Sequence, residues 1–153
     1  MFGATERGTV AVVASQTIDF EVPARSHEVA GARHAVVDHL MARGVSSIVV
    51  DDIELVTSEL VTNAIVHPDQ TGPDVVVHVR VDVSDEVVLS VANVGPADAI
   101  PPVEDWHAAS PAALSGRGLG IVRRLCDHVA VEQRGELAVV TCRRQLPDGG
   151  AMP

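Results

Sequence analysis

The residues of this chain that could do chemistry begin with one short polar segment. Glu59 and Asn63 stand four positions apart, so on a helix their side chains share one face, one turn apart. A carboxylate can take a proton from a hydroxyl group or a water molecule, and an amide oxygen is a hard ligand that suits Mg²⁺. The spacing by itself favours a solvated polar helix face, so the chemical interpretation needs a second element.

The second element is the glycine-rich loop Gly116-Arg117-Gly118-Leu119-Gly120, which precedes a helix expected at residues 121–128. Glycines let backbone N–H groups approach an anion closely, and a helix N-terminus binds phosphate. The loop lacks the Lys of a P-loop, and Ile121 stands where a dinucleotide-binding loop has its third glycine. A tight loop before a helix, with a solvated Arg, is an equal alternative. Together, the loop and the polar segment predict a nucleotide site that belongs to neither of those two classes.

The pattern of apolar residues predicts the elements that must position these groups. Alternating apolar residues predict strands, and apolar residues three or four apart predict helices. The expected order is a strand at 17–22, helices at 26–44 and 51–67, hairpin strands at 75–83 and 87–93, a loop at 95–115, a helix at 121–128, and hairpin strands at 129–133 and 137–143. Short hairpin turns require antiparallel pairing. The expected fold class is therefore α+β, a two-layer α/β sandwich whose mostly antiparallel mixed sheet is covered by helices on one face.

Three local predictions accompany this outline. Ser26 is expected to cap the first helix, and Asp51 with Glu54 forms a variant of the capping box at the start of the second. The loop at 95–115 is long and rich in proline, which is typical of a lid with little to pack. Its Trp106 either covers a ligand, marks a docking surface or anchors the loop on the core.

The composition limits the classes of function. The chain has 153 residues, of which 46% are hydrophobic, and this suits one globular domain. It carries 11 Lys+Arg against 21 Asp+Glu, a net charge of −10, so non-specific nucleic-acid binding is not expected. The sequence has no apolar run of membrane-spanning length, and its first residues do not follow the order of a signal peptide. We therefore expect a cytoplasmic protein with no nucleic-acid or membrane partner.

The expected organisation is a single domain at residues 15–146, with an N-terminal extension at 1–14 and a disordered tail at 147–153. Cys126 and Cys142 have neither a disulfide-framework pattern nor zinc-ligand spacing, and we expect them to be small buried residues. The seven histidines are scattered and contain no zinc motif. The oligomeric state is left open, with a homodimer as one expectation.

Two motifs resemble those of a known superfamily of ATPases. The pattern Glu59-x-x-x-Asn63-Ala64-x-x-His67 resembles the N box of the GHKL (Bergerat-fold) ATPases, which include the catalytic domains of histidine kinases. The glycine loop at 116–120 resembles the G2 box of the same superfamily. The segments 56–64 and 121–127 closely resemble one branch, the RsbW-like anti-sigma-factor serine/threonine kinases. The similarity covers residues 17–145, which is nearly the whole expected domain.

The resemblance implies an ATP-binding kinase that uses Mg²⁺. Glu59 would be the general base, and Asn63 would be the Mg²⁺ ligand. The residues that would surround the phosphates are Gly116, Arg117, Gly118, Leu119 and Gly120. The implied partners are an anti-anti-sigma protein, which is phosphorylated on Ser or Thr, and a sigma factor, which is sequestered.

The adenine-binding motif of this superfamily, the G1 box, is altered in this chain. The usual pattern is Asp-x-Gly-x-Gly, and this chain has Asn93-Val94-Gly95-Pro96-Ala97. The Asp of the pattern accepts a hydrogen bond from the adenine amino group. Asn93 keeps one acceptor oxygen without the charge that strengthens such a bond, and Ala97 replaces a glycine. Asn93 and Gly95 are the expected adenine-side residues. The alternative function is a non-catalytic GHKL-fold regulator that binds proteins and has weak or lost nucleotide binding.

Overall fold

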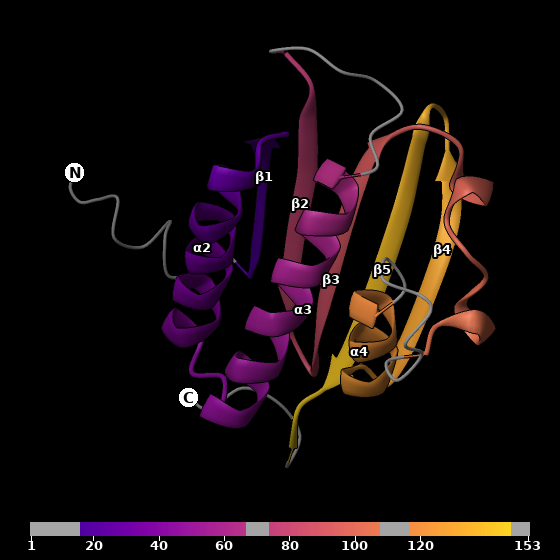
Figure 1. The fold of residues 1–153 in the computed structure, drawn as a ribbon. Helices are drawn as coiled ribbons and strands as arrows, with labels where there is room; N and C mark the ends of the chain where they lie inside the picture. Colours follow the sequence, from indigo (N-terminus) through magenta and orange to yellow (C-terminus); the bar gives the residue numbers. More distant parts are fainter. Residues whose placement is uncertain (1–15, 67–73, 108–116, 148–153) are drawn as a thin grey trace.

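The computed structural model describes residues 16–66, 74–107 and 117–147 of the chain (Figure 1). The elements are β1 (Thr17–Pro23), η1 (Ser26–Glu28), α2 (Val29–Ala42), α3 (Ser47–Val66), β2 (Val76–Val83), β3 (Glu86–Val94), η2 (Ala97–Ala99), η3 (Val103–Asp105), α4 (Arg117–Leu125), β4 (His128–Arg134) and β5 (Leu137–Gln145). Among these described elements, no helix combines the length and the apolar character needed to span a membrane. The order of helices and strands agrees with the predicted order.

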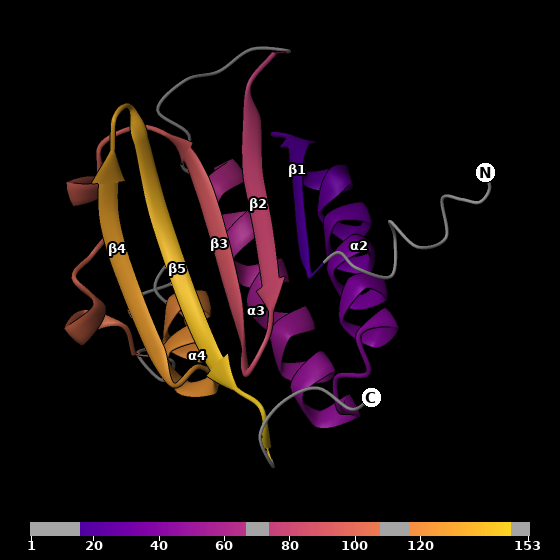
Figure 2. The same ribbon diagram turned by 180° about the vertical axis from the view of Figure 1, so that it is seen from behind.

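The five strands form one sheet in the order β1-β2-β3-β5-β4, and neighbouring strands are antiparallel in every pair. Helices α2, α3 and α4 lie on one face of this sheet (Figure 1). None of the described helices lies on the opposite face (Figure 2). The predicted two-layer α/β sandwich is therefore confirmed.

The hairpin of β2 and β3 positions a predicted site residue by simple alternation. Val77, Val79 and Val81 of β2 are at most 1% exposed, because every second residue of the strand faces the helices. Val91 of β3 is paired with Val79, so it faces the helices too. Asn93 lies two residues further along β3 and has the same orientation. The end of β3 therefore presents the Asn93 amide to the helical layer.

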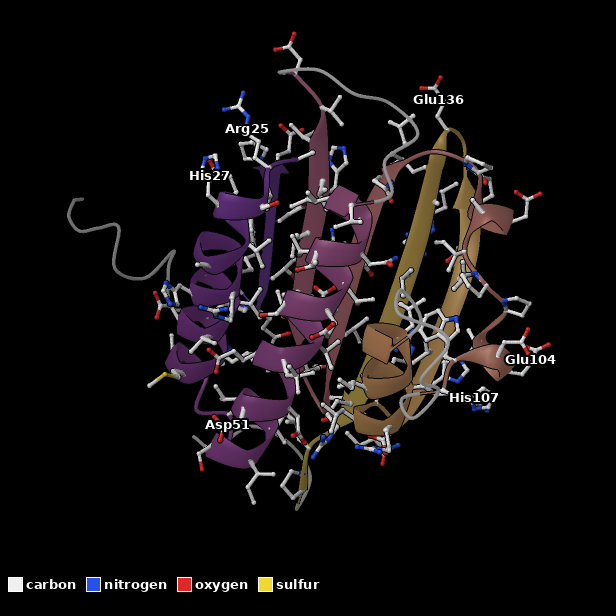
Figure 3. All side chains as sticks on the ribbon, in the orientation of Figure 1. Arg25, His27, Asp51, Glu104, His107 and Glu136 are labelled. Carbon is white, nitrogen blue, oxygen red and sulfur yellow. The ribbon has the colours of Figure 1, made fainter. Side chains whose placement is uncertain are left out.

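Helix α3 begins one turn earlier than predicted. It starts at Ser47, and the Val50 N–H donates a hydrogen bond to Ser46 O at 3.0 Å. The predicted start at Asp51 was wrong because Val49 and Val50 are buried, and burying them requires the helix to extend towards its N-terminus. Asp51 is instead an exposed residue within the helix (Figure 3). The predicted apolar stripe is confirmed as buried, and it consists of Ile53, Val56, Leu60 and Ala64.

The start of α2 also differs from the prediction, whereas its end does not. Ser26 begins the short helix η1, and Glu28 occupies the N-cap position of α2 without a side-chain hydrogen bond. The prediction that Ser26 caps this helix was wrong, because one turn of 3₁₀ helix intervenes. Gly44, the predicted stop, follows α2 with a φ of 75°, a conformation that favours glycine.

The loop that follows β3 is anchored on the core by Ile100, Val103 and Trp106. Trp106 is only 2% exposed, and its Nε1–H donates a hydrogen bond to Pro101 O at 2.8 Å. Arg123 of α4 donates to Glu104 O at 3.0 Å. The expectation of a lid with little to pack was therefore wrong for this part, and Trp106 anchors the loop. The remainder of the expected lid, residues 108–116, lies outside the described residues.

The two cysteines lie near each other at the end of α4 and on β5. Cys142 is buried and Cys126 is half-buried, and both are free thiols. The hydrogen bond with Cys126 and burial raise the pKa of the Cys142 thiol well above its usual range, so it remains protonated. The prediction of a small buried residue is thus confirmed for Cys142.

Candidate functional site

A cavity of about 330 Å³ is formed by α3, α4, the ends of β3 and β5, and the loop after β3. It brings together four of the predicted site residues, which are Asn63, Asn93, Gly95 and Leu119. The other lining residues are Leu60, Ala64, Val91, Val94, Pro96, Ala99, Ile100, Pro101, Ala138 and Val140. Residues separated by up to 80 positions in the sequence therefore meet at one site.

Helix α3 contributes one polar group to an otherwise apolar wall. Leu60, Asn63 and Ala64 line the cavity together because positions three and four apart share a helix face. Leu60 and Ala64 are buried in the core, whereas Asn63 is half-buried. The Asn63 amide can therefore contact both a ligand in the cavity and solvent at its edge.

The end of β3 supplies the second amide and a sharp change of direction. Asn93 is half-buried, and its partner across the sheet is Ala138 of β5, whose small side chain leaves space beside the amide. Gly95 has a φ of 150°, which is accessible to glycine and strained for other residues. Its N–H donates to Glu136 O at 3.0 Å. This geometry directs the chain from β3 into the loop that closes the cavity.

Sequence reasoning missed the apolar walls of the cavity. Val91 and Val140 are partners across β3 and β5, and both face the helices. Ile100 and Pro101 come from the loop after β3. Alternation along β3 could have identified Val91, which lies two residues before Asn93, but the remaining walls depend on cross-strand register and loop packing. Apolar walls with a few polar groups suit a flat ligand with polar edges.

Glu59 lies against the first turn of α4 and not in the cavity wall. A Cβ atom on Gly118 would stand 3.2 Å from the Cδ and 3.5 Å from the Cβ of Glu59, and it would overlap the Oε1 atom. Only glycine therefore leaves the carboxylate in its present position. The contact joins two motifs whose contacting residues, Glu59 and Gly118, are 59 positions apart in the sequence.

Helix α4 begins inside the glycine loop. The predicted start at Ile121 was wrong, because the helix already includes Arg117 and has Gly118, Leu119 and Gly120 in its first turn. The first N–H groups of a helix have no partner within the helix and attract anions. The predicted phosphate-binding residues thus coincide with the one part of α4 that can bind an anion through its backbone. Gly116, His67 and the side chain of Arg117 lie outside the described residues.

The described residues contain no group of three or more His, Cys, Asp and Glu side chains that could hold a metal ion. Such a group would supply most of the ligands of a metal ion from the side chains of the protein. The amide oxygen of Asn63 fits a different arrangement, in which Mg²⁺ keeps several waters and joins one protein ligand to phosphate oxygens.

The chain matches a family model described as a histidine kinase-like ATPase domain over residues 22–144. This match extends from β1 to β5 and includes every residue that lines the cavity. No match was found among curated proteins.

Solved structures with a similar fold include two that match most of this chain. One contains the RsbU and RsbW domains of Rv1364c from Mycobacterium tuberculosis, with a TM-score of 0.65 and 16% identity over 91% of this chain. This chain spans only 35% of that longer chain. The other is the SiaB-SiaC complex from Pseudomonas aeruginosa, with a TM-score of 0.56 and 16% identity over 89% of this chain and 94% of that one. At these identities the similarity is one of fold.

We predict that Gly118→Ala and Gly31→Ala have opposite consequences although both replace a helical glycine. A Cβ on Gly31 of α2 meets nothing within 4 Å, so Ala should stabilise the helix by about 0.5–1 kcal/mol. In Gly118→Ala the displacement of the Glu59 carboxylate should cancel this gain. Chemical denaturation of both variants measures the two free energies of unfolding.

A double-mutant cycle isolates the contact with Glu59. In a Glu59→Ala background, Gly118→Ala should recover the stabilisation that Gly31→Ala gives, because no carboxylate remains to be displaced. An equal gain from Gly118→Ala with and without Glu59 would show that the two residues do not constrain each other.

Proposed function

Because the chain belongs to the family of histidine kinase-like ATPase domains, we propose that it is an ATP-binding regulator of the anti-sigma-factor type. In this proposal it phosphorylates a Ser or Thr of an anti-anti-sigma partner and sequesters a sigma factor. Family membership implies ATP as the ligand. The observation that carries the proposal is the meeting of Asn63, Asn93 and Leu119 in one cavity, with Glu59 against the first turn of α4.

The proposed orientation of ATP follows from the chemistry of the two ends of the site. The apolar walls and the Asn93 amide suit adenine, which has two apolar faces and a polar edge. The backbone N–H groups in the first turn of α4 suit the phosphates. Leu119 lies where these two regions meet, since it belongs to α4 and lines the cavity.

Mg²⁺ is the proposed second cofactor, and Asn63 is the residue that would hold it. Its amide oxygen is a hard, neutral donor on the wall of the cavity, and a single protein ligand suits an ion that stays largely hydrated. When bound, Mg²⁺ would neutralise phosphate charge that develops during transfer. Asn63 would thereby help to fix the γ-phosphate relative to Glu59.

Glu59 is the proposed general base for phosphoryl transfer. Its carboxylate would accept the proton of the partner's Ser or Thr hydroxyl as that oxygen forms a bond to the γ-phosphorus. The bond between the γ-phosphorus and the β–γ bridging oxygen breaks, and ADP leaves. Gly118 supports this role because it leaves room for the carboxylate beside the helix N-terminus.

The proposed partners are proteins, and two observations support this. One similar fold was solved as the SiaB-SiaC complex, and the other is an RsbW domain joined to an RsbU domain. The net charge of −10 disfavours non-specific nucleic-acid binding. We further propose a cytoplasmic protein with one domain at residues 15–146, an N-terminal extension at 1–14 and a C-terminal tail at 147–153.

The second candidate function is a non-catalytic regulator that binds proteins and has weak or lost nucleotide binding. Asn93 and Ala97 favour it, since they replace the charged acceptor and the second glycine of the G1 pattern. Calorimetric titration of the wild-type protein with ATP and Mg²⁺ distinguishes the two candidates. Heat of binding with a defined stoichiometry supports the kinase proposal, and its absence supports the second candidate.

Replacing Glu59 by Gln tests the catalytic step. We expect Glu59→Gln to retain ATP affinity and to slow phosphoryl transfer by about 10²–10⁴-fold, the range for loss of a general base. Transfer of radiolabelled phosphate from ATP to purified anti-anti-sigma proteins of the same organism measures the rate. Glu54→Gln is the matched control on α3, since Glu54 pairs with Arg33 of α2 at 3.4 Å. Equal rates for Glu59→Gln and wild type would remove Glu59 from the mechanism.

Replacing Asn63 by Ala tests the metal ligand. We expect Asn63→Ala to weaken ATP binding by about 1–2 kcal/mol when Mg²⁺ is present, the scale of a lost bond to a charged group. Binding in the presence of a chelator should be unchanged. Titrations of Asn63→Ala and of the neighbouring exposed control Thr62→Ala, each with and without Mg²⁺, measure the difference. An equal loss in both conditions would contradict the metal role.

Replacing Asn93 by Asp tests the adenine contact. A carboxylate only accepts hydrogen bonds, so it suits the adenine amino group and repels the guanine carbonyl, whereas an amide can present either a donor or an acceptor. We expect Asn93→Asp to tighten ATP binding by about 1 kcal/mol and to leave GTP binding unchanged or weaker. Parallel titrations of both proteins with both nucleotides measure this. If the Asp variant binds ATP no better, Asn93 does not contact adenine.

A further inference from the structure

One side chain of β4 holds the loop that follows β3. The Oε1 atom of Gln133 accepts a hydrogen bond from the Ala97 N–H at 2.6 Å. Its Nε2 atom donates to Gly95 O at 3.1 Å. Gly95 and Ala97 are two residues apart, so the amide of Gln133 offers them the same C=O and N–H pair that a neighbouring β-strand would offer.

The same amide also joins this loop to the β4–β5 turn. Nε2 of Gln133 also lies 3.1 Å from both Gly135 O and Leu137 O, so its two hydrogens are shared among three carbonyl oxygens. The N–H of Gly95 donates to Glu136 O at 3.0 Å, and Figure 3 shows Glu136 at the end of the turn. The turn and the loop are thereby fixed to each other at one point.

This point lies beside the wall of the cavity. Gln133 is paired with Ala138, two positions beyond the pair of Val131 and Val140, so it faces the helical side of the sheet. Ala138 and Val140 line the cavity. The loop residues that line it include Gly95, whose carbonyl Gln133 holds. The bonds of Gln133 therefore determine where this wall stands relative to β3 and β5.

We propose that Gln133 is a positioning residue for the adenine end of the nucleotide site. This inference rests on the proposed nucleotide binding. Ala97 stands where the G1 pattern has a glycine, and its N–H is taken up by Gln133. The Gln133 amide holds the altered loop in one conformation. It thereby keeps the distance between Asn93 and the loop wall at the value that an adenine ring requires.

Two variants of Gln133 and one control separate this role from general stability. Gln133→Met keeps the length of the side chain and removes all of its hydrogen bonds. Gln133→Glu keeps the acceptor for Ala97 N–H but places a carboxylate among carbonyl oxygens that need a donor. Arg134→Ala is the control, since Arg134 is the next exposed residue of β4 and pairs with Glu132 at 2.5 Å.

The first readout is hydrogen exchange at the Ala97 amide. Exchange should become at least about threefold faster in both Gln133 variants, because that scale corresponds to the loss of a net hydrogen bond. The Trp106 amide, which donates to Val103 O at 3.0 Å, serves as an internal reference and should not change. Arg134→Ala should leave both amides as they are in the wild type.

The second readout is the affinity for ADP and ATP, with and without Mg²⁺. Gln133→Met should weaken binding by about threefold to tenfold, the range of one net hydrogen bond. The loss of affinity should be equal for ADP and ATP and independent of Mg²⁺, because in this proposal the loop contacts the adenine and not the phosphates. Gln133→Glu should weaken it at least as much. A general loss of stability would not produce this pattern at a temperature where all variants are folded.

The outcomes separate this inference from the proposed function. Unchanged exchange at Ala97 in Gln133→Met, or faster exchange with unchanged nucleotide affinity, would overturn the positioning role while leaving nucleotide binding intact. If the wild-type protein binds neither ADP nor ATP, the proposed function fails and the nucleotide role of Gln133 fails with it. Exchange at Ala97 would then still report whether Gln133 holds the loop.

Discussion

Helices α3 and α4 meet where a Cβ atom on Gly118 would overlap the carboxylate of Glu59, and this contact joins the two polar motifs of the candidate site. The Glu59 carboxylate occupies the space that a Cβ would take. Any larger residue would move either the carboxylate or the helix N-terminus. The contact therefore places the Glu59 carboxylate beside the first turn of α4, whose backbone N–H groups have no partner within the helix. Helix propensity alone would favour Ala at this position, because Gly within a helix is less stable than Ala.

The sheet determines the orientation of Asn93, the second part of the site. Its valine-rich central strands are buried under the helices, and the alternation that buries Val79 and Val91 also turns Asn93 towards α3. A shift of one residue in the register of β3 would place Asn93 on the opposite face of the sheet. The antiparallel pairing with β5 then brings Ala138 opposite Asn93 and leaves space for a ligand. Packing of the core and formation of the cavity thus have the same cause.

The fold was predictable from the sequence where its signals are local. Alternating valines predicted β2 and β3, and Gly44 predicted the end of α2. The errors occur where tertiary burial overrides local signals. Val49 and Val50 extend α3 beyond its apparent cap at Asp51, and α4 begins within glycines that have low helix propensity because its first turn packs on α3. A single tryptophan in a loop has no periodic pattern, so the sequence does not show whether Trp106 anchors the loop on the core or covers a ligand.

The site was predictable in part for a related reason. Glu59, Asn63 and the glycine loop form short motifs whose proposed roles use only their own side chains or backbone, so a resemblance could identify them as candidates. The apolar walls and the Gln133 bonds depend on which residues of distant strands meet, and a single sequence does not contain that information in any local pattern.

Charge restricts how an anionic nucleotide could occupy this site. A protein with a net charge of −10 repels a polyphosphate overall, so the phosphates require a local source of positive potential. Of the described elements around the cavity, α4 is the one that directs a helix N-terminus to the site, and the opposite wall presents apolar groups and a neutral amide. In the proposed orientation the adenine end therefore lies towards Asn93 and the phosphate end towards Gly118. The terminal phosphate would then lie beside Glu59, where proton transfer from an attacking hydroxyl group would be needed.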